Sequence, residues 1–182
     1  GCGMSKHDLT LAVERHATSK LPTDNLDSIS TLGFRGEALP SIGSVSRLTI
    51  ISRARDAETA WEIDVAGGDI EDVKPSSLNK GTKVEIRDLF YATPARLKFL
   101  KTDRTEIGRA ADIIRRIAMV NPNISFTLND GTPTNIRFNG AQGNLPNIQL
   151  SRIGEVLGRD FEENSLLIEA EREGFILTGY AG

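Results

Sequence analysis

Residues 33–53 read GFRGEALPSIGSVSRLTIISR, and this stretch carries two local signals that bear on the fold. The first is the Glu-Ala-Leu start of a helix, directly after a Phe-Arg pair that stands between two glycines. The second is the alternation of apolar and polar residues at 47–53, which is typical of a strand with one buried face. A helix and a strand in such close succession predict a domain that mixes the two.

Similar signals extend in both directions along the chain. Alternating patterns predict further strands at 60–68 and 82–89. Strands are also expected at 165–171 and 175–181, and a hairpin at 124–138 with Asp130-Gly131 near its turn. Helices are expected at 5–17, 103–119 and 151–158, and a long polar loop at 22–36. Because these elements show no regular βαβ repeat, the sequence favours an α+β fold over a doubly wound one.

Three local details of the helices can also be predicted. Ser5 and Asp8 have the spacing of a capping box at the start of the first helix. His16 closes the apolar stripe of that helix, so a partly buried polar side chain is expected there. Pro94 is placed to begin a short helix in which Leu97 and Leu100 face inward.

The helix expected at 103–119 has the clearest amphipathic pattern and lies in a basic part of an acidic chain. The apolar residues of one face are Ile107, Ala110, Ala111, Ile114, Ile117 and Ala118, and Arg109, Asp112 and Arg116 lie opposite. The formal net charge is −3, yet residues 91–120 carry seven basic and three acidic side chains. This excess favours a polyanionic partner. A solvated helix face is the alternative.

Composition limits the class of protein. The 182 residues are 38% hydrophobic and 26% charged, and include a single cysteine and two histidines. One cysteine excludes an intrachain disulfide, and a zinc site is not expected. No apolar run reaches the roughly 18 residues that a membrane span needs, so a cytoplasmic, or nucleoid-associated, protein with no membrane partner is predicted. Both ends look cut, which suggests a piece of a longer protein.

Familiar catalytic motifs such as G-x-x-x-x-G-K-[ST], HExxH and G-x-S-x-G are absent from the sequence. Four other stretches could carry chemistry: GCGM at 1–4, RHATSK at 15–20, GFRGEAL at 33–39 and GTKVEIRDLFYATPARLKFLK at 81–101. Taken alone, each has a simpler explanation as a turn, a basic helix end or a strand followed by a helix. For Arg35 the choice is even, because a helix start after glycines can bind an anion or form a turn.

Taken in order, the four stretches resemble the ATP-binding region of the MutL family of DNA mismatch repair proteins. That family belongs to a group of ATPases with type II topoisomerase subunits, a heat-shock chaperone and histidine kinases. The resemblance covers essentially the whole chain, and it implies an α/β sandwich: a mixed, largely antiparallel sheet with helices on one face. ATP would bind on this sandwich under a mobile lid, with Mg²⁺ as its metal ion.

The resemblance also assigns roles to individual residues. Gly1 and Gly3 would line the adenine end of the pocket, and Thr82 would help to hold adenine through water. The remaining ATP-binding residues, in the lid and around the triphosphate, would be Thr18, Ser19, Lys20, Gly33, Phe34, Arg35, Gly36, Glu37, Ala38 and Leu39. Non-specific DNA binding along the phosphate backbone would use Lys98, Arg109, Arg115 and Arg116.

Parts of the family pattern are missing. The Glu that activates water and the Asn that holds Mg²⁺ would precede Gly1, as would the Asp that reads adenine. A lysine that reaches the γ-phosphate in the family would come from a segment after residue 182. The expectation is therefore that this chain contains no catalytic residue and no metal ligand, and that by itself it hydrolyses little or no ATP.

The resemblance extends to organisation and partners. Residues 1–140 would be the ATP-binding domain without its N-terminal part, 141–149 a polar linker, and 150–182 the beginning of a second, transducer-like domain. The parent protein would be an ATPase that forms a homodimer through its N-terminal regions on binding ATP and contacts mismatch-recognition and downstream repair proteins. Another ATPase of the group, or a non-catalytic DNA- or partner-binding module, is the alternative.

Overall fold

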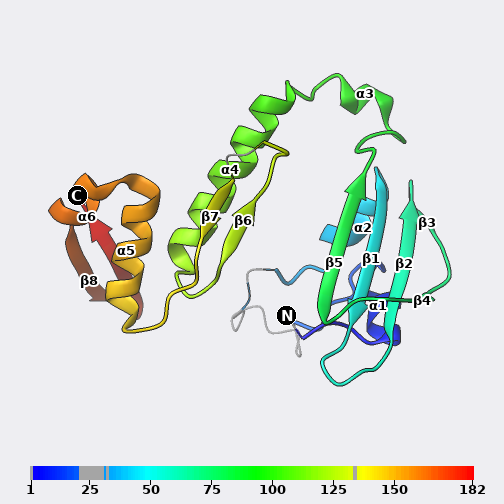
Figure 1. Cartoon of the computed structure of the whole chain (residues 1–182), viewed down its shortest axis with the longest axis horizontal. Helices are drawn as coiled ribbons and strands as arrows, with labels where there is room; N and C mark the ends of the chain where they lie inside the picture. Colours follow the sequence, from blue (N-terminus) through cyan, green and yellow to red (C-terminus); the bar gives the residue numbers. More distant parts are fainter. Residues whose placement is uncertain (1, 21–30, 32, 133–134) are drawn as a thin grey trace. The chain divides into compact units, whose positions relative to one another are not determined.

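The computed structural model describes residues 2–20, 31, 33–132 and 135–182 (Figure 1). The chain divides into two compact units, Gly1–Leu100 and Lys101–Gly182. Most of the loop expected at 22–36 lies outside the described residues. Each unit is α+β, with antiparallel strands and helices, as the sequence predicted.

The first unit is organised around an antiparallel sheet. Its central strand β1 (Arg47–Arg53) pairs with β2 (Ala60–Ala66) on one side and with β5 (Gly81–Arg87) on the other. The short strands β3 (Asp69–Ile70) and β4 (Lys74–Ser76) both pair with β2. The strands expected at 47–53, 60–68 and 82–89 are confirmed, with observed bounds Arg47–Arg53, Ala60–Ala66 and Gly81–Arg87.

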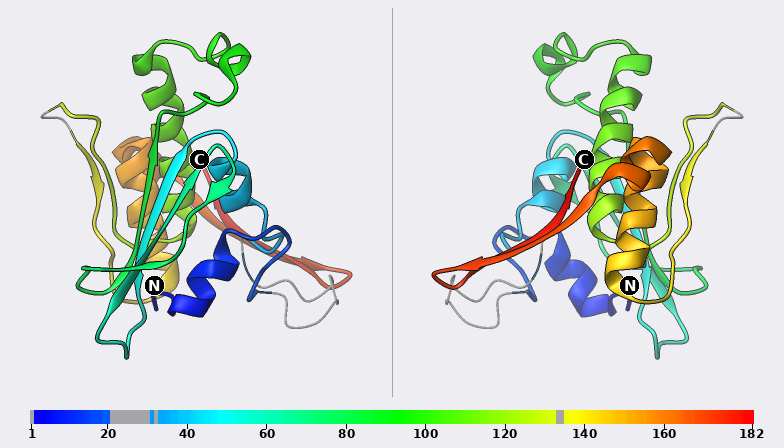
Figure 2. Two further views of the ribbon diagram at one scale, coloured as in Figure 1. Left: turned by 90° about the vertical axis from the view of Figure 1, so that its right-hand side faces the viewer. Right: turned by 90° about the vertical axis from the view of Figure 1, so that its left-hand side faces the viewer.

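Two helices, α1 (Lys6–Ala12) and α2 (Ala38–Gly43), contribute to a core on one face of this sheet (Figure 2). Strand register brings Leu48 opposite Val65 and Ile50 opposite Ile63, and all four side chains are buried. The apolar half of each alternating pattern therefore forms the core against which the helices pack.

The same face continues onto β5, but there it is less well covered. Val84 lies opposite Ile50 and Ile86 lies opposite Leu48, so both point to the core side of the sheet. Their exposed fractions are nevertheless 45% and 47%. The helices α1 and α2 thus cover β1 and β2 more completely than β5.

Helix α1 is shorter than the periodicity predicted. The capping box is present: the Asp8 amide donates to Ser5 Oγ at 3.2 Å, and the Ser5 amide donates to Asp8 Oδ2 at 3.2 Å. However, the helix ends at Ala12 instead of near residue 17. His16 has φ 63°, a left-handed conformation that a helix cannot continue through, and it turns the chain away from the α1 axis.

The short helix α3 (Pro94–Leu97) begins at Pro94 as expected. Leu97 and Leu100 are 44% and 40% exposed, so the prediction that they face inward is wrong. Before this helix the backbone takes positive φ at Asp88 and Phe90, and the segment leaves the sheet instead of packing across it. A helix of only four residues offers too little surface to bury both leucines.

The second unit begins with the long helix α4 (Asp103–Val120), which is followed by a hairpin of β6 (Phe126–Leu128) and β7 (Ile136–Phe138). Helices α5 (Leu145–Leu157) and α6 (Arg159–Asn164) come next, and the antiparallel pair β8 (Leu166–Arg172) and β9 (Phe175–Ala181) completes it. The predicted linker is already helical from Leu145, because Pro146 favours the first helical turn. The contacts thus divide the chain near residue 100, ahead of the expected boundary at 141–149.

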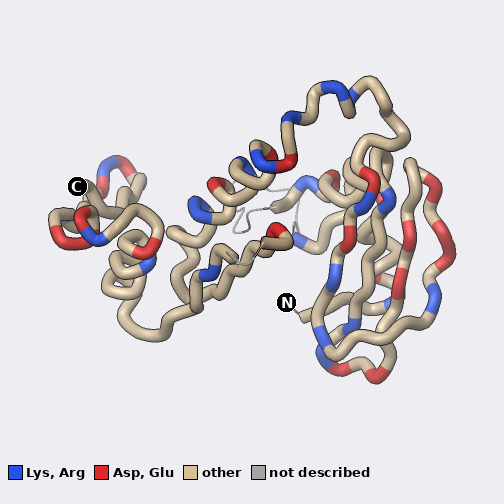
Figure 3. Tube along the Cα trace, turned by 45° about the horizontal axis from the view of Figure 1, so that its top comes forward, with Lys and Arg blue, Asp and Glu red and all other residues tan. Residues whose placement is uncertain are grey.

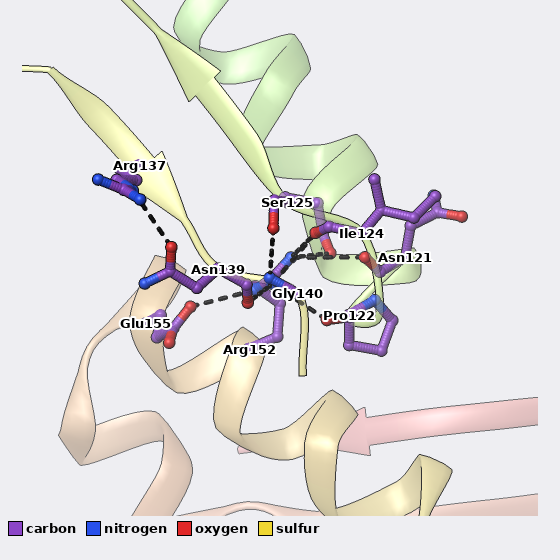
Figure 4. Close-up of polar contacts among 10 residues, drawn as sticks. Asn121, Pro122, Ile124, Ser125, Arg137, Asn139, Gly140, Arg152 and Glu155 are labelled. Carbon is purple, nitrogen blue, oxygen red and sulfur yellow. Dashed lines mark hydrogen bonds and ion pairs between the residues drawn. The ribbon is translucent and has the colours of Figure 1, made fainter. Parts of the chain in front are cut away.

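Arg152 of α5 is the main polar connection inside the second unit (Figure 4). Its side chain is 2% exposed and donates to the carbonyls of Ala118 at 3.1 Å, Pro122 at 3.1 Å and Asn139 at 2.6 Å. Its Nε lies 3.1 Å from Glu155 Oε2. The guanidinium therefore joins the C-terminal end of α4 and the end of β7 to α5.

No helix in the described part of the chain has the length and apolar character that crossing a membrane requires.

Candidate functional site

A cavity of about 1070 Å³ lies in the first unit, between α1, the segment that follows it and the start of α2. Eleven of the thirteen residues assigned to ATP line it: Gly3, Thr18, Ser19, Lys20, Gly33, Phe34, Arg35, Gly36, Glu37, Ala38 and Leu39. Gly1 lies outside the described residues, and Thr82 lies outside the cavity wall. Three of the four motif stretches thus meet in one place, although they are separated along the chain.

Close backbone contact brings the RHATSK and GFRGEAL stretches together. Gly36 has φ 66°, and a Cβ at this position would lie 2.5 Å from the carbonyl oxygen of Ala17. Only glycine allows this approach, since both the backbone angle and the space exclude a side chain. Gly33 is similarly near Lys20, whose Nζ would lie 3.6 Å from a Cβ on Gly33.

A side-chain contact strengthens this junction. One carboxylate oxygen of Glu37 accepts a hydrogen bond from the backbone N–H of His16 at 3.0 Å and lies 2.8 Å from His16 Nδ1. The His16 side chain is 85% exposed, so the predicted partial burial is wrong. The early end of α1 explains the error, because His16 is no longer on the apolar stripe of a helix.

The opposite end of the cavity is formed by the GCGM stretch, which is held against the ends of β1 and β5. Gly3 has φ 73°, and a Cβ there would collide with the backbone carbonyl of Arg53. The Met4 amide donates to Ser52 Oγ at 2.7 Å, and Ser52 Oγ lies 2.8 Å from Thr82 Oγ1. Thr82 is therefore connected to the cavity wall through Ser52.

The charges of the cavity are unequally paired. Asp8 is engaged in the capping box, where the Ser5 hydroxyl and then the Ser5 backbone N–H lower the pKa of its carboxyl group. Glu37 is engaged with His16. Lys20 and Arg35 form no ion pair with any other described residue, and the Arg35 guanidinium lies 5.6 Å from the centroid of the Phe34 ring. Two cations are thus available to an anionic ligand.

The sequence did not predict every residue that lines the cavity. The additional lining residues are Cys2, Met4, Asp8, Leu11, Ala12, His16 and Ala17. Several of them belong to α1, whose apolar pattern indicated only a core helix. The pattern contained no sign that one side of α1 borders a cavity, since apolar and small residues line both cores and ligand sites.

The residues assigned to DNA are divided between the two units, with Lys98 in the first and the three arginines on α4 in the second. Figure 3 shows basic positions along α4 with acidic positions among them. Arg109 lies 3.3 Å from Glu106, and Arg115 lies 2.9 Å from Asp112. Arg116 is exposed and forms no ion pair with another described residue. Of the three arginines assigned to DNA, Arg116 is therefore the one that is not engaged in an ion pair with an acidic side chain of α4.

No three side chains among His, Cys, Asp and Glu in the described part of the chain are grouped so that they could hold a metal ion by themselves. A Mg²⁺ ion that binds together with a nucleotide takes only one or two ligands from the protein and the rest from phosphate oxygens and water.

No protein-family model matches the chain. Among curated proteins it is 60% identical over 181 residues to the DNA mismatch repair protein MutL of Rhodospirillum rubrum, and 56% identical over 182 residues to MutL of Paramagnetospirillum magneticum. All of the chain is aligned in both cases. It spans only 29% and 30% of the length of these relatives.

Solved structures give a consistent result. The chain superposes on the ATPase domain of Aquifex aeolicus MutL complexed with ADP with a TM-score of 0.69, at 28% identity, covering 93% of this chain and 57% of that one. The N-terminal domain of a DNA repair protein has the same fold, with a TM-score of 0.70 at 23% identity over 99% of this chain and 55% of that one. Sequence identity along its whole length and this fold agree: the chain belongs to the MutL family.

Proposed function

We propose that this chain is the central part of the N-terminal ATPase region of a DNA mismatch repair protein, and that its cavity binds ATP. The observation that carries the proposal is that eleven residues from three separate motif stretches line one cavity. The relative from Aquifex aeolicus was solved as an ATPase domain with ADP, which supports a nucleotide as the ligand.

The chemistry of the cavity supports a particular orientation of the nucleotide. The triphosphate would lie beside Lys20 and Arg35, where the glycines at 33 and 36 leave backbone N–H groups accessible. The base would lie toward Gly3 and Met4. Phosphate oxygens would thus meet the two cations that have no acidic partner in the described part of the chain.

Hydrolysis needs further groups. A general base must orient water and a metal ion must neutralise charge on the phosphates. From the family resemblance we propose that the base and the Mg²⁺ ligand belong to a segment before Gly1. Residues 1–140 would then be most of the ATP-binding domain, 141–149 its connection, and 150–182 the beginning of a transducer-like domain.

DNA, a second copy of the protein and other repair proteins are the proposed partners, in the cytoplasm. The exposed arginines of α4 support a contact with the phosphate backbone of DNA. Dimerisation through the N-terminal regions on ATP binding is proposed from the family resemblance. For the 182-residue chain by itself, a DNA- or partner-binding module without catalysis is the second candidate, favoured by the exposed arginines of α4.

Titration with a fluorescent ATP analogue tests the proposed ligand. The full-length protein is expected to bind the analogue, and Arg35→Ala is expected to weaken binding about tenfold or more, since a charged hydrogen bond to phosphate is lost. The 182-residue chain is expected to release little or no phosphate from ATP. Appreciable turnover by this chain that Arg35→Ala abolishes would contradict the assignment of the general base to another segment.

A further inference from the structure

We propose that the outer face of the first unit's sheet docks an extended segment of a partner protein, in which an acidic residue lies two positions from a basic one. The outer face is the side of β1, β2 and β5 opposite the core that α1 and α2 cover. A cavity of about 410 Å³ lies on it, lined by residues of these strands and by Glu71. Figure 3 shows both basic and acidic positions on the strands.

Two arginines form the positive end of this face. Arg47 of β1 lies directly opposite Arg87 of β5, and like charges in this relation destabilise a sheet. Their acidic contacts are weak: Arg87 Nη2 lies 3.5 Å from Glu85 Oε1, and Arg47 Nε lies 3.2 Å from the exposed side chain of Asp88. An anionic group bound between the two guanidinium groups would relieve the repulsion.

The loop after β5 holds Arg47 ready for such a group. The Arg47 guanidinium lies 4.5 Å from the centroid of the Tyr91 ring, and its Nε faces Asp88. Asp88 and Phe90 have φ of 51° and 68°, a left-handed conformation that costs free energy in residues other than glycine. The Phe90 amide donates to the Val45 carbonyl at 2.7 Å, which holds the loop against the start of β1. The terminal N–H groups of Arg47 have no partner among the described residues, and their planar arrangement matches a carboxylate.

The negative end lies one step along the strands. Thr49 stands between Asp64 of β2 and Glu85 of β5, and Asp64 accepts a hydrogen bond from its hydroxyl. The backbone N–H of Glu71 donates to the Asp64 carbonyl, and the Glu71 side chain forms no ion pair with any other described residue. Phosphates of a polyanion such as DNA would be repelled by these carboxylates, whereas a lysine or arginine would be attracted. The face therefore suits a protein segment that carries both charges.

The spacing of the two ends defines the segment. Arg47 and Thr49 are two residues apart on β1, which corresponds to about 7 Å. In an extended segment, side chains that point to the same side are also two residues apart. An acidic residue on the arginines thus places a basic residue two positions away beside Asp64 and Glu85. Adjacent acidic and basic residues would point to opposite sides.

The test uses two acetylated and amidated pentapeptides of identical composition, Ala-Glu-Ala-Lys-Ala and Ala-Glu-Lys-Ala-Ala. Binding to the full-length protein is followed by NMR, through the Nε–H signals of isotopically labelled arginines. The first peptide is expected to bind about fivefold more tightly than the second, because only its two charges reach the face together. Ala-Glu-Ala-Glu-Ala should also bind more weakly than the first peptide, since its second carboxylate meets Asp64 and Glu85.

Two variants examine the two ends. Arg87→Gln and Glu85→Gln are each expected to weaken binding of the first peptide about fivefold. Arg55→Gln removes an exposed charge from the loop between β1 and β2, outside the cavity, and should leave the affinity unchanged. Arg87→Gln should also raise the midpoint of urea unfolding, because it removes the repulsion with Arg47. Its loss of binding then cannot be due to unfolding.

Several results would overturn the inference. Equal affinities for the two isomeric peptides, or an equal loss in Arg55→Gln and Arg87→Gln, would reduce the effect to attraction by net charge. A lower urea midpoint in Arg87→Gln would show that the arginine pair is stable without a ligand. Tightest binding of the diacidic peptide, or duplex DNA binding that falls in Arg87→Gln, would identify a polyanion as the occupant. Arg35→Ala, which affects the proposed nucleotide site, should bind the peptides as the wild type does, so the two proposals fail separately.

Discussion

Glu37 and His16 are 21 residues apart in sequence, yet one oxygen of the Glu37 carboxylate contacts both the backbone N–H and the ring Nδ1 of His16. The contact joins the start of α2 to the segment that carries Thr18, Ser19 and Lys20. Gly36, the neighbour of Glu37, makes the backbone approach to Ala17 that this junction needs. The two sides of the proposed phosphate site are therefore attached to each other at their base.

Glu37→Gln is predicted to weaken nucleotide binding with only a small loss of stability of the fold. The pair is largely solvent-exposed, so its loss should change the free energy of unfolding by no more than about 1 kcal/mol. The segment 16–20 would lose its attachment, and the affinity for a fluorescent ATP analogue is expected to fall about fivefold, by the same free energy. Glu14→Gln, which removes a nearby exposed carboxylate, should leave both quantities unchanged. Equal affinities of wild type and Glu37→Gln would show that the contact has no part in binding.

The longer strands of this chain could be predicted to within about two residues, but the short strands β3 and β4 and the cavity could not. Alternation at 47–53 gave the observed bounds of β1, because one apolar residue in two is a direct consequence of a buried face. Helix ends were predicted less well. Helix α1 ends at Ala12, and the turn that follows has a positive φ at His16 and a contact with Glu37, 21 positions away, which no local pattern contains.

The residues of the site also differ in whether the sequence could predict them. From local chemistry, the stretch with Gly33, Arg35 and Gly36 could be either an anion-binding site or a structural turn. The order of the four motif stretches along the chain then favoured a nucleotide site. Ser52 could not be selected, since a serine near the end of a strand has no distinctive pattern. Its contacts arise only when β1 brings it beside Met4 from the start of the chain and Thr82 from β5.

Asp8 is predicted to make the stability of the chain pH-dependent in the acidic range. The Ser5 hydroxyl and backbone N–H lower its pKa in the folded state below the ordinary value of 3.8. A lowered pKa in the folded state means stabilisation that is present above the unfolded value and is lost as pH falls through the folded value. Asp8→Asn should therefore reduce the slope of unfolding free energy against pH below about pH 4.

Urea unfolding at a series of pH values measures this slope. Ser5→Ala is the informative companion, because it keeps the carboxyl group but removes the hydroxyl that lowers its pKa. Both variants should lose a similar part of the pH dependence. If Ser5→Ala retains the full slope, the capping box is not its origin.

Arg152 is predicted to be the most sensitive polar residue of the second unit. Arg152→Met would remove the hydrogen bonds to the carbonyls of Ala118, Pro122 and Asn139, of which the first two keep a backbone N–H donor. A loss of about 1.5–3 kcal/mol is expected, as for hydrogen bonds to a charged group. Arg152→Lys keeps the positive charge but loses the planar guanidinium with its several N–H donors, so its loss of stability should be smaller than that of Arg152→Met. Arg137→Met, on an exposed residue of the adjacent hairpin, is the control and should cost no more than about 0.5 kcal/mol. Similar urea midpoints for the two methionine variants would contradict the role of Arg152.

Arg116 is predicted to contribute more to DNA binding than Arg109 and Arg115 of the same helix. Arg109 and Arg115 each form an ion pair with the acidic residue three positions earlier, whereas Arg116 forms no ion pair with another described residue. A phosphate contact through Arg116 would therefore not compete with an internal ion pair. Arg116→Glu in the full-length protein should weaken binding to duplex DNA of any sequence and reduce the slope of log affinity against log salt by about one.

Fluorescence anisotropy with a labelled duplex, over a range of salt concentrations, measures both quantities. Arg109→Glu and Arg115→Glu are matched in charge and lie on the same helix, so they control for the general loss of positive charge. They are expected to have smaller effects at low salt, because Glu106 and Asp112 already neutralise part of their charge. Equal losses of DNA affinity in the three variants would indicate attraction by net charge alone. An unchanged affinity of Arg116→Glu at low salt would contradict the proposed contact between α4 and DNA.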